Sequence, residues 1–227
     1  MVGLNGVLLD IDGTLVDSND SQTHAWIDAL MQAGYRVGFE KIRPHIGMGA
    51  DKLLPLVAGL EYNSLEGKRI ARRRAEIFRT RYLPCLETMP GARELIMEMH
   101  DSGLKLIAVS SGDEEEVRAL LGLLRVHRFI DGWVTSADAP HSRPAPDLIF
   151  AALKKASLRQ HEAVLLGDTP YDVQAAKHAG IDCIGFRSGG WQDRHLEGAV
   201  ATYDGPADML VHFDHSPLFT EYLARTA

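Results

Sequence analysis

The stretch VLLDIDGTLVDS, residues 7–18, places two aspartates at the end of a continuous apolar run. Because the run is apolar rather than alternating, it predicts a strand that is covered on both faces. In an extended segment residues i and i+2 project to the same side, so Asp10 and Asp12 would present two carboxylates to one point. A divalent cation such as magnesium would offset the cost of burying them, because hard ions prefer oxygen ligands. The alternative is a β-hairpin with Asp12-Gly13 as its turn.

Other apolar runs of strand length follow along the chain, and helical patterns lie between most of them. The runs span residues 104–109, 163–166 and 183–186, with weaker ones at 133–134 and 199–203. The alternation of strand and helix from residue 91 onward predicts an α/β fold with a doubly wound parallel sheet and right-handed crossovers. In such sheets ligands bind beyond the carboxyl ends of the strands, so the polar residues after each run form the candidate site.

Residues 16–86 interrupt this alternation with segments of helical periodicity at 22–33, 51–60 and 64–83. They predict an inserted α-helical module at residues 16–86, which leaves residues 1–15 and 87–227 as the core. The last segment is rich in cations, namely Lys68, Arg69, Arg72, Arg73, Arg74, Arg79 and Arg81. A solvated helix face explains them most simply, and a rim that attracts anions is the alternative.

Composition limits the remaining classes of function. The chain of 227 residues has a formal net charge of −7, which argues against a dedicated nucleic-acid surface. Cys85 and Cys183 stand far apart, so we expect free thiols in a reducing compartment. The first residues contain no basic leader, and no apolar run approaches transmembrane length. We therefore expect a cytoplasmic protein that binds neither nucleic acid nor membrane.

Polar residues with phosphate-binding character follow the run at 104–109. Ser110 and Ser111 come first, and Gly112 leads into Asp113 and Glu116, which are spaced as a capping box at a helix start. Hydroxyls and free backbone donors near a helix N-terminus can hold a phosphate. Capping alone would explain Asp113 and Glu116, but it gives Ser110 no role.

Acidic residues and one cation occupy two further strand ends. After residues 163–166 come Asp168, at the same edge of the sheet as Asp10, and Asp172, where the next helix begins. A favourable interaction with the helix dipole is the simpler explanation of Asp172. Between these segments lies SRPAPD, residues 142–147, a stiff loop that delivers Arg143 before a helix. An EF-hand is excluded, because Ser21 replaces its closing glutamate and a strand precedes the loop.

In this order, the four segments resemble the motifs of the haloacid dehalogenase (HAD) superfamily over essentially the whole chain. DIDGTLVDS resembles the first motif, VSS the second, SRPAPD the third and GDTPYD the fourth. The resemblance implies a Rossmann-like core with a small helical cap at residues 16–86, and it removes the hairpin alternative. It also implies a magnesium-dependent phosphotransferase similar to phosphoglycolate phosphatases or β-phosphoglucomutases.

The resemblance assigns a role to each matching residue. Asp10 would attack phosphorus, and Asp12 would protonate the leaving oxygen and then deprotonate water. Ser110 would hold a phosphoryl oxygen, and Arg143 would neutralise charge on the phosphoryl group. Asp172 would support the bound cation without contacting it directly. The metal ligands would be Asp10, Asp168 and the carbonyl of Asp12. The third motif usually offers lysine, and Arg143 keeps the charge but differs in shape.

Further candidates come from the cap and from the second motif. The turn at residues 47–49 and nearby Lys52 would face the core, and His24 and Trp26 could line the same cavity or simply pack in their helix. The candidate substrate-binding residues are therefore Ser111, Gly112, His24, Gly49 and Lys52.

We expect a phosphatase of the HAD type that acts on a small phosphorylated metabolite, as a monomer or homodimer. One alternative is a β-phosphoglucomutase-like isomerase that returns the phosphoryl group to the sugar. Another is a phosphonoacetaldehyde hydrolase-like enzyme with Lys52 after a Met-Gly pair, although that group lacks the acid at Asp12. The third alternative is a protein module that binds phosphate and catalyses no reaction.

Overall fold

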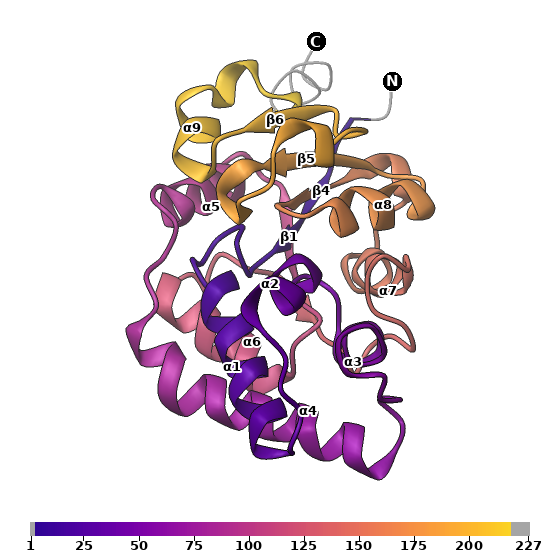
Figure 1. Ribbon diagram of the computed structural model, residues 1–227. Helices are drawn as coiled ribbons and strands as arrows, with labels where there is room; N and C mark the ends of the chain where they lie inside the picture. Colours follow the sequence, from indigo (N-terminus) through magenta and orange to yellow (C-terminus); the bar gives the residue numbers. More distant parts are fainter. Residues whose placement is uncertain (1–2, 219–227) are drawn as a thin grey trace.

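A six-stranded parallel sheet forms the centre of the protein (Figure 1). In the computed structural model, which describes residues 3–218, the strand order is β3-β2-β1-β4-β5-β6. The first strand therefore pairs with two strands that follow it at long distance in the sequence. The strands are β1 (Gly6–Asp10), β2 (Lys105–Val109), β3 (Gly132–Val134), β4 (Ala163–Gly167), β5 (Asp182–Phe186) and β6 (Ala201–Tyr203). The predicted α/β fold with a doubly wound parallel sheet is confirmed.

Helices cover both faces of the sheet, which explains why β1 is apolar without alternation. Val7 and Leu9 belong to one apolar cluster with residues of α5 (Ala92–Asp101), α6 (Glu114–Leu124) and α9 (Pro206–Val211). Leu8 belongs to a second cluster with α7 (Asp147–Ala156) and α8 (Pro170–Ala179). Successive strand residues face opposite sides, and all three side chains are fully buried. Truncating such a leucine to alanine typically costs about 2–5 kcal/mol.

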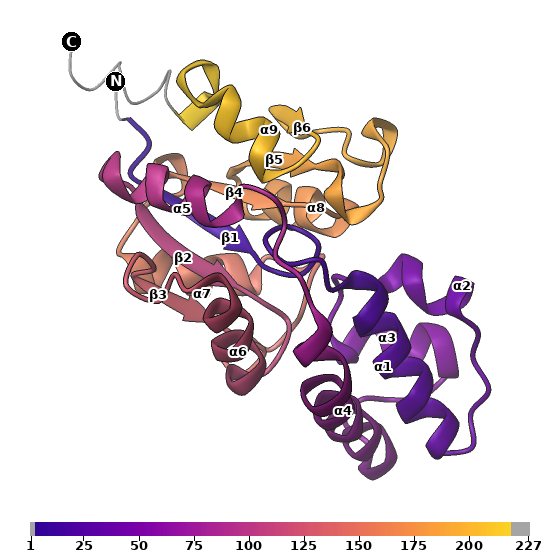
Figure 2. The same cartoon turned by 90° about the vertical axis from the view of Figure 1, so that its left-hand side faces the viewer.

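A helical module lies beyond the carboxyl end of β1 rather than over a face of the sheet (Figure 2). It comprises α1 (Asn19–Gln32), α2 (Phe39–Ile42), η1 (Arg43–His45), α3 (Ala50–Ala58), α4 (Leu65–Ile77), η2 (Phe78–Tyr82) and η3 (Leu83–Cys85). The segment between β1 and β2 thus has the helical character that its periodicity indicates. The division of the chain into a core and a cap stays a prediction, and residues 1–2 and 219–227 of the predicted core lie outside the described residues.

Helix boundaries in the module differ from the predicted ones for local reasons. α1 begins at Asn19, three residues before the predicted start, because its first turn is polar and carries no apolar periodicity. The last segment is α-helical only to Ile77, and it continues as a π-helical turn and then a 3-10 turn that contains Pro84. Proline lacks the backbone N–H that an α-helix would use at this position.

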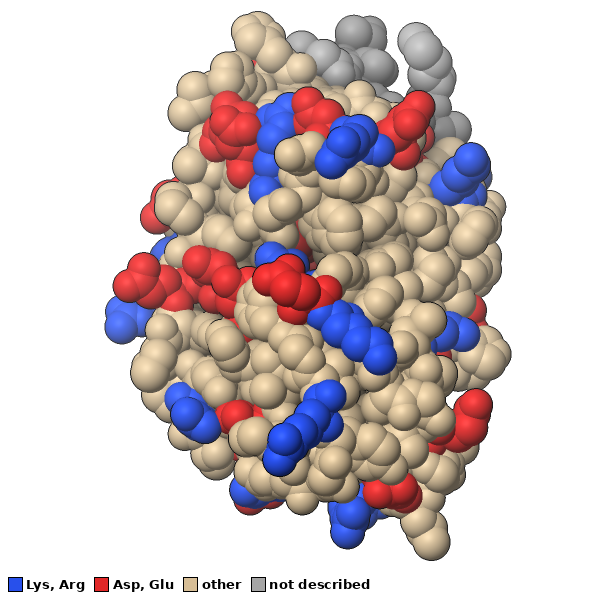
Figure 3. All heavy atoms as spheres, viewed as in Figure 1, with Lys and Arg blue, Asp and Glu red and all other residues tan. Residues whose placement is uncertain are grey.

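The surface charges, the cysteines and the lengths of the helices do not identify a binding partner. Acidic and basic side chains are interspersed on the face drawn in Figure 3. Both cysteines are free, with Cys85 exposed and Cys183 buried. Within residues 3–218, every helix is too short or too polar to cross a lipid bilayer.

Candidate active site

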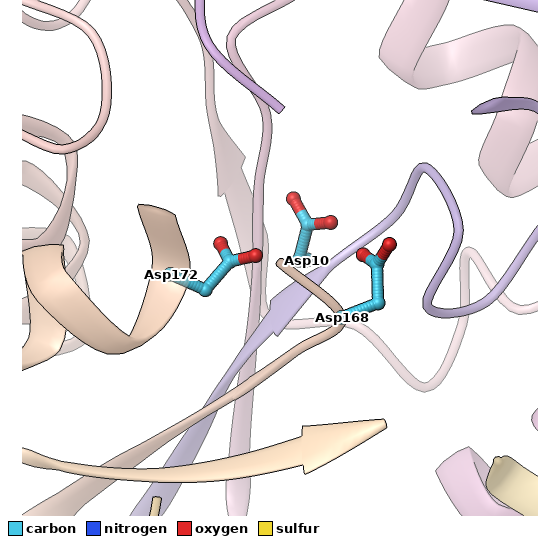
Figure 4. A group of neighbouring side chains, drawn as sticks. All are labelled: Asp10, Asp168 and Asp172. Carbon is cyan, nitrogen blue, oxygen red and sulfur yellow. The ribbon is translucent and has the colours of Figure 1, made fainter. Parts of the chain in front are cut away.

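Three acidic side chains meet at the adjacent carboxyl ends of β1 and β4. Asp10 is the last residue of β1, and Asp168 directly follows β4, its neighbour in the sheet. Asp172 joins them from the first turn of α8. One carboxylate oxygen of each lies within 4.8 Å of the others, and all three residues are buried (Figure 4). The structure thus brings Asp10 and Asp168 together, as the argument from strand ends expects; we call the three residues the acid cluster.

Arg143 is the buried cation beside the acid cluster. Its Nη1 donates to Oδ1 of Asp10 at 2.5 Å and also to Oδ1 of Asp172. The Arg143 side chain is only 3% exposed, and its Nε has no hydrogen-bond partner among the described residues. One guanidinium therefore bridges two of the three acids from the loop before α7.

Burial and mutual repulsion shift the pKa values in this group. Burial raises the pKa of Asp10 well above its usual range, although Arg143 acts in the opposite direction. Burial, together with the neighbouring Asp172, raises the pKa of Asp168 to about 7. Burial alone would lower the pKa of Arg143, but its ion pairs with Asp10 and Asp172 raise it instead. The acid cluster is therefore a place where negative charge is poorly compensated.

Thr14 and Asn19 hold Asp168 in position. Thr14 Oγ1 donates to its Oδ1 at 2.8 Å, and Asn19 Nδ2 donates to its Oδ2 at 3.0 Å. The turn that delivers them contains Gly13 at φ +78°, where a Cβ would overlap both Asn19 and the Asp168 carboxylate. Sequence reasoning missed Thr14 and Asn19, and their place within ten residues of Asp10 was the signal that could have found them.

The acid cluster is compatible with a bound divalent cation. Its three carboxylates face one guanidinium, so a hard cation would offset the remaining negative charge with the oxygen ligands it prefers. Asp172 has both oxygens engaged, since Oδ1 accepts from Arg143 and Oδ2 accepts from Thr169 N at 3.0 Å and Oγ1 at 2.6 Å. Both oxygens of Asp168 also accept hydrogen bonds, so these contacts do not separate the three acids as ligands. The direct role of Asp10 and Asp168 and the supporting role of Asp172 stay predictions.

Asp12 is not part of the acid cluster. Its Oδ1 accepts from Ser18 Oγ at 2.5 Å and from Gln22 Nε2 at 3.0 Å, so the carboxylate is held toward α1. Asp12 comes two residues after the end of β1 and lines a cavity together with Arg143, and its joint role with Asp10 stays a prediction. Metal binding by the Asp12 carbonyl stays a prediction.

The segment after β2 supplies hydroxyl and amide groups. Ser110 is buried, and its Oγ accepts from the Gly112 amide at 3.0 Å. Ser111 Oγ donates to the Gly47 carbonyl at 3.5 Å, a contact between the core and the helical module. Asp113 caps α6 by accepting from the Glu116 amide at 2.8 Å. The predicted capping box is only half formed, because the Glu116 carboxylate accepts from Gln22 and Arg74 instead.

A small cavity of about 40 Å³ lies between these strand ends and the helical module. Core and module both line it, and the residues include Asp12, Trp26, Gly49, Ser111, Gly112 and Arg143. Lys52 lines an adjoining groove of about 630 Å³ instead. His24 lines neither of these two; its ring lies 5.3 Å from that of Phe39 and 6.2 Å from that of Tyr82, measured between centroids. The substrate-binding role of His24 stays a prediction.

Sequence reasoning missed a polar network in this cavity. Arg74 and Glu116 form an ion pair at 2.8 Å, and Gln22 contacts both residues. The Arg74 side chain is only 11% exposed, so a solvated helix face does not describe it. Charge type alone could not separate Arg74 from the exposed arginines beside it in the sequence.

A sequence match to a known family agrees with this fold and with this arrangement of acids. The profile of the haloacid dehalogenase-like hydrolases matches residues 7–186, from β1 to the end of β5. The chain belongs to that family, and the prediction of a HAD-type hydrolase is confirmed.

One curated protein and two solved structures show which members of the family this chain is similar to. A phosphoglycolate phosphatase from Pseudomonas fluorescens is 32% identical over 192 residues, which cover 81% of this chain and 69% of the relative. The crystal structure of a hydrolase from Pseudomonas syringae is 29% identical with a TM-score of 0.86, covering 93% of this chain and 98% of that one. A proposed β-phosphoglucomutase from Bacteroides vulgatus is 26% identical with a TM-score of 0.84, covering 97% and 91%. The expectation of a phosphoric monoester hydrolase is confirmed by the phosphoglycolate phosphatase relative and by the family match.

Proposed function

We propose that this chain is a magnesium-dependent phosphatase that hydrolyses a small phosphomonoester, such as a sugar phosphate or a phospho-acid, through an aspartyl-phosphate intermediate. The observation that carries the proposal is the convergence of Asp10 with Asp168, Asp172 and Arg143 beside a cavity under the helical module. The phosphoglycolate phosphatase relative supports the same reaction class.

In the first step a carboxylate oxygen of Asp10 attacks phosphorus and the bond to the substrate oxygen breaks. Asp12 gives a proton to that oxygen, which leaves as an alcohol. In the second step water attacks phosphorus, Asp12 takes a proton from the water, and phosphate leaves Asp10. Splitting the transfer in this way lets water replace the alcohol at one fixed centre. Asp12 suits proton transfer because its carboxylate lies outside the acid cluster.

Magnesium, when bound, would neutralise charge that develops on the phosphoryl oxygens. Asp10 and Asp168 would hold it, with the Asp12 carbonyl as a further ligand and Asp172 in support. Ser110 and Arg143 would hold the phosphoryl group from the protein side, since preorganised donors supply most of the stabilisation in such reactions.

We also propose that residues 16–86 form a cap over a core made of residues 1–15 and 87–227. The cavity between them is small, and it is lined by Gly49 from the module and by Ser111 and Gly112 from the core. A cap that closes over the site favours a small metabolite over a phosphoprotein, because closure must exclude water around the whole substrate. Lys52, in the adjoining groove, would meet the end of the substrate that carries no phosphate.

A β-phosphoglucomutase-like activity is the second candidate, and the 26% identical structure from Bacteroides vulgatus favours it. The same nucleophile would then return the phosphoryl group to a sugar. A panel of phosphoglycolate and hexose phosphates, assayed with magnesium for free phosphate and for rearranged sugar, separates the two. The phosphatase proposal expects phosphate release, whereas rearranged sugar phosphate without net release would refute it.

A further inference from the structure

The Arg74–Glu116 pair connects the helical module to the core inside the proposed active site. Arg74 lies on α4, Glu116 in the first turn of α6, and Gln22 on α1. All three line the cavity together with Asp12. We propose, on the basis of the phosphatase function above, that Glu116 is a positioning residue that orients the general acid Asp12 through Gln22 when the module is seated on the core.

Hydrogen bonds run without a break from the module to Asp12. Arg74 Nη1 donates to Glu116 Oε2 at 2.8 Å and to Gln22 Oε1 at 2.9 Å. Gln22 Nε2 donates to Glu116 Oε1 at 2.6 Å and to Asp12 Oδ1 at 3.0 Å. The Gln22 amide therefore has one orientation, because its nitrogen meets two carboxylates and its oxygen meets a guanidinium.

This orientation determines which oxygen of Asp12 can serve the substrate. Oδ1 accepts from both Gln22 and Ser18, whereas Oδ2 accepts no hydrogen bond from residues 3–218. Because Asp12 lines the cavity, Oδ2 is the oxygen left to exchange a proton with the leaving group. Losing the Gln22 contact would leave Ser18 as the one remaining donor among residues 3–218, so the carboxylate would be held less firmly.

Burial makes Glu116 the centre of this arrangement. Its side chain is 1% exposed, and both of its oxygens are occupied. An amide at position 116 would offer one acceptor oxygen instead of two, so either Gln22 or Arg74 would lose its hydrogen bond to this residue. The guanidinium of Arg74 also lies 5.2 Å from the centroid of the Trp26 ring, which limits its freedom to find another partner.

The test compares two substrates that differ in how much they need an acid. Phosphoglycolate has an alkoxide leaving group that must be protonated, whereas p-nitrophenyl phosphate releases a stable phenolate. General acid catalysis contributes roughly 10²–10⁴-fold, so E116Q, which misplaces Asp12 without removing it, should lower kcat/KM for phosphoglycolate by about 10–100-fold. For p-nitrophenyl phosphate we expect a loss below about threefold, because the phosphoryl transfer to Asp10 that kcat/KM reports needs no acid there.

A control in the same helix separates positioning from general loosening of the module. Glu115 and Asp113 pair with Arg79 at 3.1 and 2.8 Å, but the Glu115 side chain is 77% exposed and lies outside the cavity. E115Q should leave both rates near wild type. Q22M, which removes the link to Asp12 but keeps Glu116, should reproduce the selective loss on phosphoglycolate if E116Q fails to fold.

Equal losses of kcat/KM on both substrates, or no loss on either, would overturn the positioning role. A wild-type protein that cleaves neither substrate with magnesium would instead refute the phosphatase function itself. The two failures are therefore distinguishable.

Discussion

Replacing Arg143 with alanine tests the electrostatics of the acid cluster directly. The substitution leaves Asp10, Asp168 and Asp172 buried without the guanidinium that bridges Asp10 and Asp172. Removing one partner of a buried ion pair typically costs about 3–5 kcal/mol, because the remaining charge is uncompensated. For a chain of this size, 1 kcal/mol corresponds to roughly 2–4 °C in Tm, so the expected decrease is about 6–20 °C.

Differential scanning calorimetry without added metal measures this effect, and phosphate release under saturating magnesium measures turnover. Turnover should fall by about 10²–10³-fold, as for removal of one donor to a developing negative charge. R143K should retain part of both, since lysine supplies the charge and several donors but on a side chain of different length and shape. R69A is the control, because Arg69 is 71% exposed and its pair with Glu66 is long at 3.9 Å. An R143A protein with wild-type Tm and turnover would refute the role of Arg143.

Three further outcomes are expected. Magnesium at about 100 times its Kd should stabilise the wild-type protein by about 2.7 kcal/mol, and D168N should abolish this shift in Tm; an unchanged shift would remove Asp168 from the metal site. T14V leaves Asp168 Oδ1 without its donor, so calorimetry should show a loss of about 1–3 kcal/mol, and a neutral effect would contradict the contact. D51A removes the contacts from Ser142 Oγ at 2.5 Å and Ser142 N at 3.2 Å, next to Arg143, and should lower kcat/KM about tenfold; unchanged kinetics would show that this link does not position the loop.

Residues at the ends of paired strands could be placed from the sequence. Asp10 and Asp168 each come at the end of a buried apolar run, and parallel strands bring their carboxyl ends to one edge of the sheet. The proximity of these two residues could therefore be predicted without knowing any side-chain conformation. The helical module could be predicted as well, because its amphipathic periodicity is local.

Contacts across the module and the core could not be predicted. Arg73 and Arg74 are adjacent and chemically identical, yet the Arg73 side chain is 43% exposed and that of Arg74 only 11%. Which face of α4 meets α6 depends on how the module packs, and periodicity does not report that. The turn after β1 likewise directs Asp12 toward Gln22, which an extended-strand argument cannot anticipate.

The D10N variant tests whether Asp10 is the nucleophile. Asparagine has nearly the same shape, so unfolding experiments should find a folded protein. With magnesium and p-nitrophenyl phosphate, the wild-type enzyme should release phosphate in repeated turnovers, and rapid acid quenching should trap one phosphoryl group on the peptide that contains Asp10. D10N should show neither phosphate release nor a phosphorylated peptide. Magnesium-dependent cleavage that survives in D10N would show that Asp10 is not the nucleophile.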